Sequence, residues 1–302
     1  MMTSHKTEEL KEWIDDNEDE LNKQTIKTYI NDYKRFRSEM TGKHNLSNLP
    51  QSEIINIVKK TKFAKLNMLN IAIVFLNWKD KPINMLIKYR TDLREKRTEN
   101  AVEKNIEIIK NAGATYEDLM RALDKATGTD FLLFYLLINY NTRNNDLIVR
   151  VIDAKDSEIT KAENFMVVGK NKTSYIRNEY KTKATYGTKT DVIRNLKFQK
   201  YIRTELENDN EYLFVNNKMK PYKQTEMGKF IKSRFKKYLK DSNLSQAVIY
   251  KIIQHHAEEN GNVNMMKNIA DARGHSIDTA FQYYSSSKYD NKQAEEMSDN
   301  DE

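Results

Sequence analysis

The chain has 302 residues, with 51 Lys and Arg against 44 Asp and Glu, a formal net charge of +7, and no cysteine. The lack of cysteine excludes disulfides and thiolate metal sites, and no apolar run approaches the ~20 residues that span a bilayer. We therefore expect a soluble intracellular protein that is long enough for two domains and binds no membrane.

The charge is unevenly distributed along the chain. Residues 1–20 hold eight acidic residues against two lysines, and residues 291–302 hold five against one. Residues 21–290 carry 48 Lys and Arg against 31 Asp and Glu, a net charge of +17. A body this basic between acidic ends is suited to a polyanion such as nucleic acid, although the charge could also serve solubility alone.

The first hundred residues are expected to be helical, since the whole chain has only 8 Gly and 3 Pro. We expect residues 1–20 to form an exposed, partly helical acidic lead-in and residues 21–98 to form a helical domain. Apolar residues recur there at helical spacing in four segments: residues 24–40, 52–60, 64–78 and 83–97. Residues 99–112, polar and charged, are expected to link this domain to a second one over residues 113–290, and residues 291–302 to form an acidic tail.

The second domain is expected to combine helices with a small sheet. Thr115 is placed to cap a helix that runs to Ala126, and the almost wholly apolar residues 131–138 predict a central buried helix. Strands and a hairpin are expected next: residues 147–153, 164–168 and 173–180, then the hairpin 178–187. Helices are expected over residues 192–207 and 225–239, the latter with a basic outer face. The predicted fold class is mainly α with a small antiparallel β-sheet.

An arginine follows the apolar helix where the chain turns toward the first strand. Arg143 comes shortly after residues 131–138, and Asp146 lies three residues further on. A guanidinium group is always charged and binds phosphate oxygens in a bidentate manner, so Arg143 is a candidate phosphate ligand. Taken alone, an arginine at this place would more simply interact with the last carbonyls of the helix.

Basic residues gather in two segments of the second domain. The region of the expected hairpin carries six of them against two acids, Glu179 and Asp191: Lys170, Lys172, Arg177, Lys181, Lys183 and Lys189. The outer face of the helix at residues 225–239 includes Lys232, Arg234 and Lys236. These side chains are candidate contacts to DNA phosphates, although a basic helix is usually a solvated face.

The C-terminal part of the chain carries a histidine and a tyrosine around a helix junction. Residues 265–273 predict a helix, and Gly274 is placed to end it because glycine adopts the left-handed conformation without steric cost. Ser276 can cap a second helix at once, so His275 would lie beside N–H groups that can receive a phosphate. Tyr284 follows nine residues after His275. Together these features suit one half of a phosphoryl-transfer site.

The pattern Gly274-His275-Ser276-x-x-Thr279, with a tyrosine nine residues after the histidine, resembles the C-terminal signature of tyrosine recombinases, the phage-integrase-type enzymes. Residues 25–29 (Thr-Ile-Lys-Thr-Tyr) resemble the opening helix of the family's core-binding domain. The resemblance covers roughly residues 21–290, and the Lys- and Asn-rich, cysteine-free composition is similar to that of recombinases from large DNA viruses and mobile elements.

The resemblance implies a nucleophile and its partners. Tyr284 is the expected attacking group on a DNA phosphodiester, with Tyr283 one residue out of register, and His275 is expected to hydrogen-bond the scissile phosphate. The family places a general acid for the leaving 5′ oxygen on a hairpin between its two arginines. Lys181 is the expected acid, and Lys183 is the next choice.

The resemblance also implies that Arg143 is the first catalytic arginine and that Asp146 braces it. The family's second arginine, on the helix before the Gly-His junction, has no counterpart here. Tyr250 or Lys251 occupies its place, and Lys251 is the only cation directly available there. A lysine supplies charge without a two-pronged grip, so we expect a rate penalty on the order of 100-fold. Arg273 could compensate, but nothing in the sequence requires it.

These motifs favour a site-specific recombinase or integrase that cleaves and rejoins duplex DNA through a 3′-phosphotyrosyl intermediate. Because the phosphotyrosyl bond conserves the bond energy, no metal, ATP or other cofactor is expected. The family implies assembly on DNA as a tetramer, inside the cell. Two alternatives stay open: a type IB topoisomerase that relaxes DNA by the same chemistry, and a recombinase-derived DNA-binding protein weakened by the loss of the second arginine.

Overall fold

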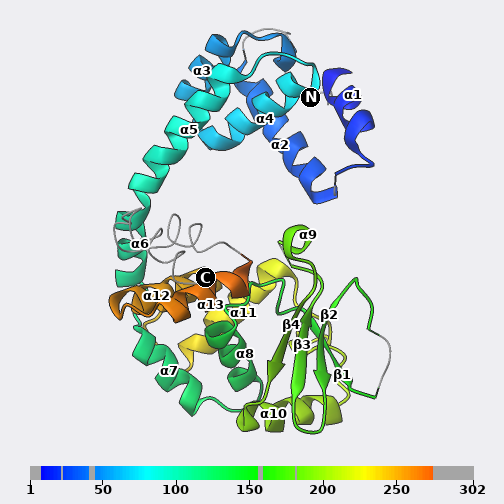
Figure 1. Cartoon of the computed structure of the whole chain (residues 1–302), viewed down its shortest axis with the longest axis vertical. Coiled ribbons are helices and arrows are strands. Elements are labelled where there is room, and N and C mark those ends of the chain that lie inside the picture. Colours follow the sequence, from blue (N-terminus) through cyan, green and yellow to red (C-terminus); the bar gives the residue numbers. More distant parts are fainter. Residues whose placement is uncertain (1–7, 22, 41–44, 156–158, 181, 275–302) are drawn as a thin grey trace, which may run out of the picture. The chain divides into compact units, whose positions relative to one another are not determined.

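The computed structural model describes residues 8–21, 23–40, 45–155, 159–180 and 182–274 (Figure 1). The chain divides into two compact units, Met1–Glu99 and Asn100–Glu302, and each has an apolar core of its own. The predicted fold class, mainly helical with a small sheet, is confirmed, and the sheet lies in the second unit.

The first unit is built around one strongly apolar helix. Its described elements are α1 (Glu8–Asn17), α2 (Lys23–Glu39), the 3₁₀ turn η1 (Leu46–Asn48), α3 (Gln51–Lys60), α4 (Lys65–Trp78) and α5 (Asn84–Glu99). Helix α4 packs against α2, α3, α5 and η1. A helix that is apolar on most sides has to be covered by its neighbours, and Leu69, Ala72 and Phe75 are fully buried. The four helices predicted for this part of the chain correspond to α2 to α5.

Helix α1 corrects the expectation that residues 1–20 form an exposed lead-in. Leu10 and Trp13 are each 1% exposed. The Trp13 ring lies 5.4 Å from that of Phe75 and 5.5 Å from that of Tyr29, measured between ring centroids. Leu10 and Trp13 are three residues apart, which places both on one face of a helix. Acidic residues dominate the composition of this segment, but its short apolar face joins it to the core.

The second unit consists of helices around a central buried helix, with the sheet beside them (Figure 1). Its described helices are α6 (Ala101–Lys110), α7 (Tyr116–Lys125), α8 (Gly128–Asn139), the single turn α9 (Lys183–Tyr186), α10 (Leu196–Glu207), α11 (Gln224–Lys236), α12 (Gln246–Glu259) and α13 (Val263–Arg273). The prediction of a buried helix over residues 131–138 is confirmed by α8, which is buried over most of its length. Helix α6 falls within residues 99–112, the stretch expected to be a linker, and packs against α12.

The sheet has the strand order β1 (Val149–Asp153), β2 (Asn164–Val168), β3 (Thr173–Arg177) and β4 (Lys189–Ile193). The β2–β3 and β3–β4 pairs are antiparallel, but β1 and β2 are parallel. The expectation of a wholly antiparallel sheet is therefore wrong for one pair. Alternation of apolar and polar residues predicts a strand without predicting its direction.

Strand β4 also replaces the start of a predicted helix. Val192 lies in β4 opposite Ser174, and α10 begins at Leu196. Asn195 caps α10, since its side-chain oxygen accepts a hydrogen bond from the Phe198 amide at 2.9 Å. The helix predicted from Val192 onward is therefore shorter, and the β3–β4 hairpin reaches further along the chain than expected.

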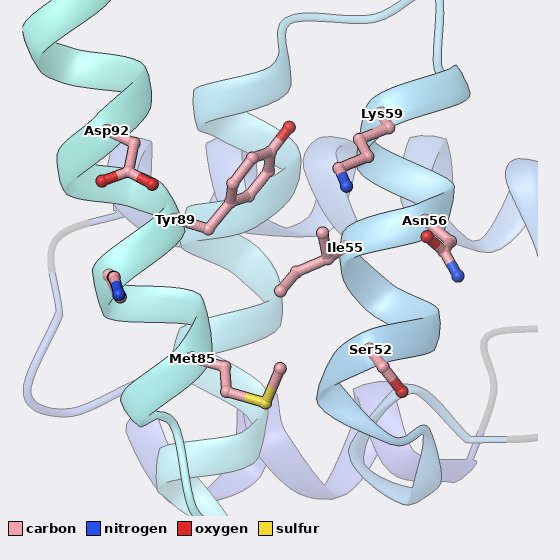
Figure 2. A pocket seen from close by; sticks show the side chains of 8 residues that line it. Ser52, Ile55, Asn56, Lys59, Met85, Tyr89 and Asp92 are labelled. Atoms are coloured by element: carbon pink, nitrogen blue, oxygen red, sulfur yellow. The ribbon is translucent and has the colours of Figure 1, made fainter.

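A groove of about 490 Å³ lies on the first unit between α3 and α5 (Figure 2). Eight side chains line it: Ser52, Ile55, Asn56, Lys59, Met85, Lys88, Tyr89 and Asp92. The Lys59 ammonium lies 5.9 Å from the centre of the Tyr89 ring. None of the eight is among the residues expected to act on DNA, all of which belong to the second unit.

Candidate active site

The turn that follows α8 presents Arg143. Asn141 has a positive φ of 45°, a conformation that Asn tolerates better than most residues and that reverses the chain here. The Arg143 amide then donates a hydrogen bond to the Asp146 carboxylate at 2.9 Å, and Asp146 is only 1% exposed. Asp146 therefore fixes the backbone of the turn from which the Arg143 side chain extends.

Three arginines from distant parts of the chain act on this one buried carboxylate. Burial raises the pKa of Asp146, while the hydrogen bond from the Arg143 amide and the charges of Arg177, Arg143 and Arg273 lower it. The Tyr175 hydroxyl, which is fully buried, donates a hydrogen bond at 2.6 Å to the main-chain oxygen of Asp146. The fold thus gathers guanidinium groups from the α8 turn, from β3 and from the end of α13.

Arg177 corrects a prediction, because its guanidinium group is engaged within the protein. It was expected to contact DNA, but it is 1% exposed and both of its terminal nitrogens have protein partners. One of its terminal nitrogens forms an ion pair with Asp191 at 2.6 Å, and the other donates to the main-chain oxygen of Ala272 at 2.9 Å. Its guanidinium carbon lies 5.1 Å from the centre of the Tyr175 ring. Arg177 therefore ties the end of α13 to strands β3 and β4.

Lys189 joins the same cluster at the start of β4. Its ammonium group donates a hydrogen bond to the main-chain oxygen of Asp271 and lies 5.3 Å from the centre of the Tyr186 ring. Burial lowers the pKa of Lys189, and the nearby Arg177 charge lowers it further. We expected Lys189 to be a surface contact to DNA, whereas it is a half-buried cation beside the arginines.

The residues expected to act as nucleophile, phosphate ligand and general acid lie outside the described residues: Tyr284, Tyr283, His275 and Lys181. Their sequence neighbours are nevertheless in contact. A methyl group added at Gly274 would come within 2.2 Å of the Thr182 hydroxyl oxygen and 3.2 Å of the Tyr186 ring. Gly274 precedes His275 in the sequence and Thr182 follows Lys181, and these two described neighbours meet at the end of α13.

Gly274→Ala is expected to destabilise the second unit by about 2–4 kcal/mol. Gly274 has φ +61°, where any L-residue is strained, and the added methyl group also collides with Thr182. Gly261→Ala is the matched control, since Gly261 has φ +57° with nothing within 4 Å of the added carbon, and about 1 kcal/mol is expected. Urea unfolding followed by far-UV circular dichroism measures both. Equal losses would contradict the close approach of Gly274 to Thr182.

Lys251, the cation expected in place of the second arginine, is directed to another element. Its ammonium group donates a hydrogen bond to the side-chain oxygen of Asn105, a buried residue of α6. Burial lowers the pKa of Lys251 to about 8, and the charges of Lys104 and Arg273 contribute in the same direction. Lys251 is thus engaged with α6 within the second unit.

The shifted pKa of Lys251 predicts a pH dependence of stability. Between pH 8 and 10.5 the folded chain binds fewer protons at Lys251 than the unfolded chain, so the contribution of Lys251 to the free energy of unfolding of the second unit should rise with pH in this window. Tyrosines such as Tyr140 and Tyr175, whose pKa is raised by burial, act in the opposite direction near pH 10, so the effect of Lys251 is read as a difference between wild type and variant. After allowance for the partial exposure of Lys251, wild type should gain about 1–2 kcal/mol relative to Lys251→Met across the window, whereas Lys200→Met, at an exposed position, should follow wild type. Urea midpoints measured across this pH range test the prediction, and the same pH dependence in wild type and Lys251→Met would contradict the assignment.

The other residues expected to bind DNA are distributed over several surfaces. Lys170 and Lys172 are exposed, but they lie at the β2–β3 turn, at the opposite end of the sheet from α9 (Figure 1). Lys183, the first residue of α9, forms an ion pair with Glu179. The hairpin lysines therefore do not form one continuous basic surface. Lys170 and Lys172 precede β3 and Lys183 follows it, so they lie at opposite ends of the strand.

The basic face of α11 is partly used in packing. Arg234 forms an ion pair with Asp130 at 3.3 Å, and its guanidinium carbon lies 4.8 Å from the centre of the Phe230 ring. Lys232 and Lys236 are exposed. Of the three cations expected on this face, Lys232 and Lys236 are therefore placed to meet a ligand from solvent, whereas Arg234 is held against α8.

Comparisons with known proteins gave only remote likenesses. No protein-family model matches the sequence, and no curated protein is similar to it. Among solved structures, the chain is similar to XerA recombinase, with 16% identity over 97% of this chain and 98% of that chain and a TM-score of 0.38. It is also similar to a lambda integrase in a dimer bound to a COC′ core site, with 12% identity over 93% of this chain and 78% of that chain and a TM-score of 0.45. At such values, a function for this chain has to be argued from its own residues.

Two further features of the described residues bear on chemistry. Within them, no group of three or more His, Cys, Asp or Glu side chains is placed to hold a metal ion. No helix among the same residues has the length and apolar character needed to cross a bilayer.

Proposed function

We propose that the chain is a tyrosine recombinase, a DNA strand transferase that cleaves and rejoins duplex DNA through a 3′-phosphotyrosyl intermediate. The observation that carries this proposal is a cluster of three arginines. Arg143 lies in the turn that Asp146 holds, Arg273 donates to the Asn141 oxygen of that same turn, and Arg177 donates to the Ala272 oxygen next to Arg273. The cluster borders the contact between Gly274 and Thr182, the sequence neighbours of His275 and Lys181. A set of cations at the junction of these motifs is what a phosphoryl-transfer site requires.

In the proposed reaction, the Tyr284 oxygen attacks the phosphorus as the phenol loses its proton to water. The bond from phosphorus to the 5′ oxygen breaks, and Lys181 gives a proton to that oxygen, which leaves as a hydroxyl group. Arg143 and His275 bind the phosphate oxygens and stabilise the charge that builds up on them. Attack by the 5′ hydroxyl of another strand on the phosphotyrosine then restores a phosphodiester and the free phenol.

The partner in this proposal is duplex DNA, bound by a tetramer of the chain inside the cell. The exposed Lys232 and Lys236 on α11 are available for phosphates, and each such contact would add to the salt dependence of binding. Lys170 and Lys172 could contact the same duplex only from the far end of the sheet. The affinity of Lys236→Gln for duplex DNA, measured at two salt concentrations, should depend on salt less steeply than that of wild type by about one phosphate contact.

A nicked duplex tests the proposal directly. The full-length chain is incubated with a pool of linear duplexes that carry a randomised segment and nicks at staggered positions, so that the short 5′-hydroxyl fragment diffuses away after cleavage. Wild type should accumulate an adduct that survives SDS. Tyr284→Phe should give none, whereas Tyr201→Phe on α10 should behave as wild type. No adduct from wild type would overturn the proposal.

Two other outcomes would change the assignment. Adduct that persists in Tyr284→Phe but disappears in Tyr283→Phe would move the nucleophile by one residue. Relaxation of a supercoiled plasmid that carries the captured sequence, without any exchange of strands between two such plasmids, would indicate a topoisomerase in place of a recombinase.

A further inference from the structure

The place on α12 where a second arginine is missing holds an aromatic ring. Tyr250 lies in the middle of α12, is 1% exposed, and faces the core of the second unit. The guanidinium carbon of Arg273 lies 3.8 Å from the centre of this ring, which is a close stacking contact. The ring thus forms a platform for a guanidinium group that comes from the end of α13.

A hydrogen bond to the turn after α8 also holds the Arg273 side chain in place. Its Nε donates a hydrogen bond at 3.3 Å to the main-chain oxygen of Asn141, and its side chain is 4% exposed. Asn141 lies in the same turn as Arg143, and the charges of both arginines act on Asp146. The two guanidinium groups therefore share one neighbourhood although 130 residues separate them in the sequence.

The end of α13 is fixed in this position by two side-chain hydrogen bonds. Arg177 and Lys189 donate hydrogen bonds to the main-chain oxygens of Ala272 and Asp271, the residues just before Arg273. Cations are favourable at these oxygens because the oxygens lie at the negative end of the helix dipole, and the Asp271 oxygen also accepts a hydrogen bond from the Gly274 amide at 2.8 Å. Gly274 then ends the helix in the left-handed conformation. Arg273 consequently extends from a firmly anchored backbone, a condition for stabilising charge in a transition state.

We infer that Arg273 supplies the second guanidinium of the phosphate site, in place of the arginine that α12 lacks. The inference rests on the proposed function and adds one residue to it. Two guanidinium groups, Arg143 from the α8 turn and Arg273 from the end of α13, bind the non-bridging oxygens of the scissile phosphate. Lys251, which donates to Asn105 on α6, is a neighbour of this pair and does not take the arginine's role.

The test uses the duplex captured by the wild-type chain and measures the rate of adduct formation. Arg273→Gln is expected to slow it on the order of 100-fold, and Arg273→Lys about 10-fold, because lysine keeps the charge but loses the planar grip. Arg121→Gln is the matched control: Arg121 pairs with Asp118 on the surface of α7, and wild-type rates are expected. Wild-type adduct shows that the proposed function holds whatever the Arg273 variants do.

A neutral substrate separates charge from structure. A methylphosphonate at the mapped cleavage position removes one phosphate charge, so the loss in Arg273→Gln relative to wild type should shrink to about 10-fold or less. Added methylguanidinium should partly restore Arg273→Ala on the ordinary substrate. Equal losses on both substrates would reduce Arg273 to a structural role. A wild-type rate of adduct formation in Arg273→Gln would also overturn the inference. So would a loss of the rate in Lys251→Gln that Arg273→Gln does not show.

Discussion

Arg143→Gln is expected to slow adduct formation on the order of 1000-fold, or about 4 kcal/mol in the activation free energy. Arg143 extends from a turn whose backbone is fixed by the buried Asp146, so the base of its side chain is held in place before DNA arrives. A preorganised cation stabilises the charge of the pentacoordinate phosphorane without a cost of reorganisation. The measurement is a single-turnover time course on the captured nicked duplex.

The affinity for DNA separates this role from simple binding. Arg143 contributes one phosphate contact among several, so the dissociation constant of Arg143→Gln for the uncut duplex should rise only a few-fold, with a salt slope reduced by about one. Arg121→Gln serves again as the control for a lost surface arginine. If affinity falls as steeply as the rate, Arg143 binds DNA without assisting the chemistry, and the proposed site is wrong.

The helices could be predicted because their signals are local. Helices α2 to α5 and α8 follow from apolar residues at helical spacing, which is a property of neighbouring residues. The parallel pairing of β1 with β2 could not be predicted in this way, since the sequence alternates identically for both directions. Helix α1 was misread because its acidic residues outweigh Leu10 and Trp13 in composition, although two apolar residues suffice to bury one face.

In the candidate site, too, the contacts between sequence neighbours could be predicted and those between distant segments could not. Arg143 and Asp146 are three residues apart, and their hydrogen bond follows from a local turn. The contacts of Arg177 with Ala272 and of Arg273 with Tyr250 join segments that only the tertiary fold brings together. The spacing of a motif carries no information on such pairs. The one local signal for Arg273 was its place directly before Gly274, which ends α13.

Glu9→Ala is expected to destabilise the first unit by about 3–5 kcal/mol. The Glu9 carboxylate is 2% exposed and accepts three hydrogen bonds: from the Tyr33 hydroxyl at 2.7 Å, the Leu46 amide at 2.9 Å and the Ser47 amide at 2.8 Å. It therefore joins α1, α2 and η1. Alanine would remove the acceptor of all three bonds from a buried position, and the loss of a buried hydrogen-bond acceptor costs about 1–3 kcal/mol for each bond.

Tryptophan fluorescence isolates this effect, because both tryptophans of the chain, Trp13 and Trp78, lie in the first unit. Urea unfolding of Glu9→Ala should show a fluorescence transition with its midpoint at a lower urea concentration than in wild type. The part of the far-UV transition that does not coincide with the fluorescence change reports the second unit, and its midpoint should stay the same. Glu8→Ala is the matched control, since Glu8 is the exposed neighbour of Glu9 on α1 and its loss should cost less than about 0.5 kcal/mol. Equal effects of the two substitutions would show that α1 is the solvated lead-in expected from its charge. Glu9 would then contribute no more to the stability of the first unit than an exposed residue.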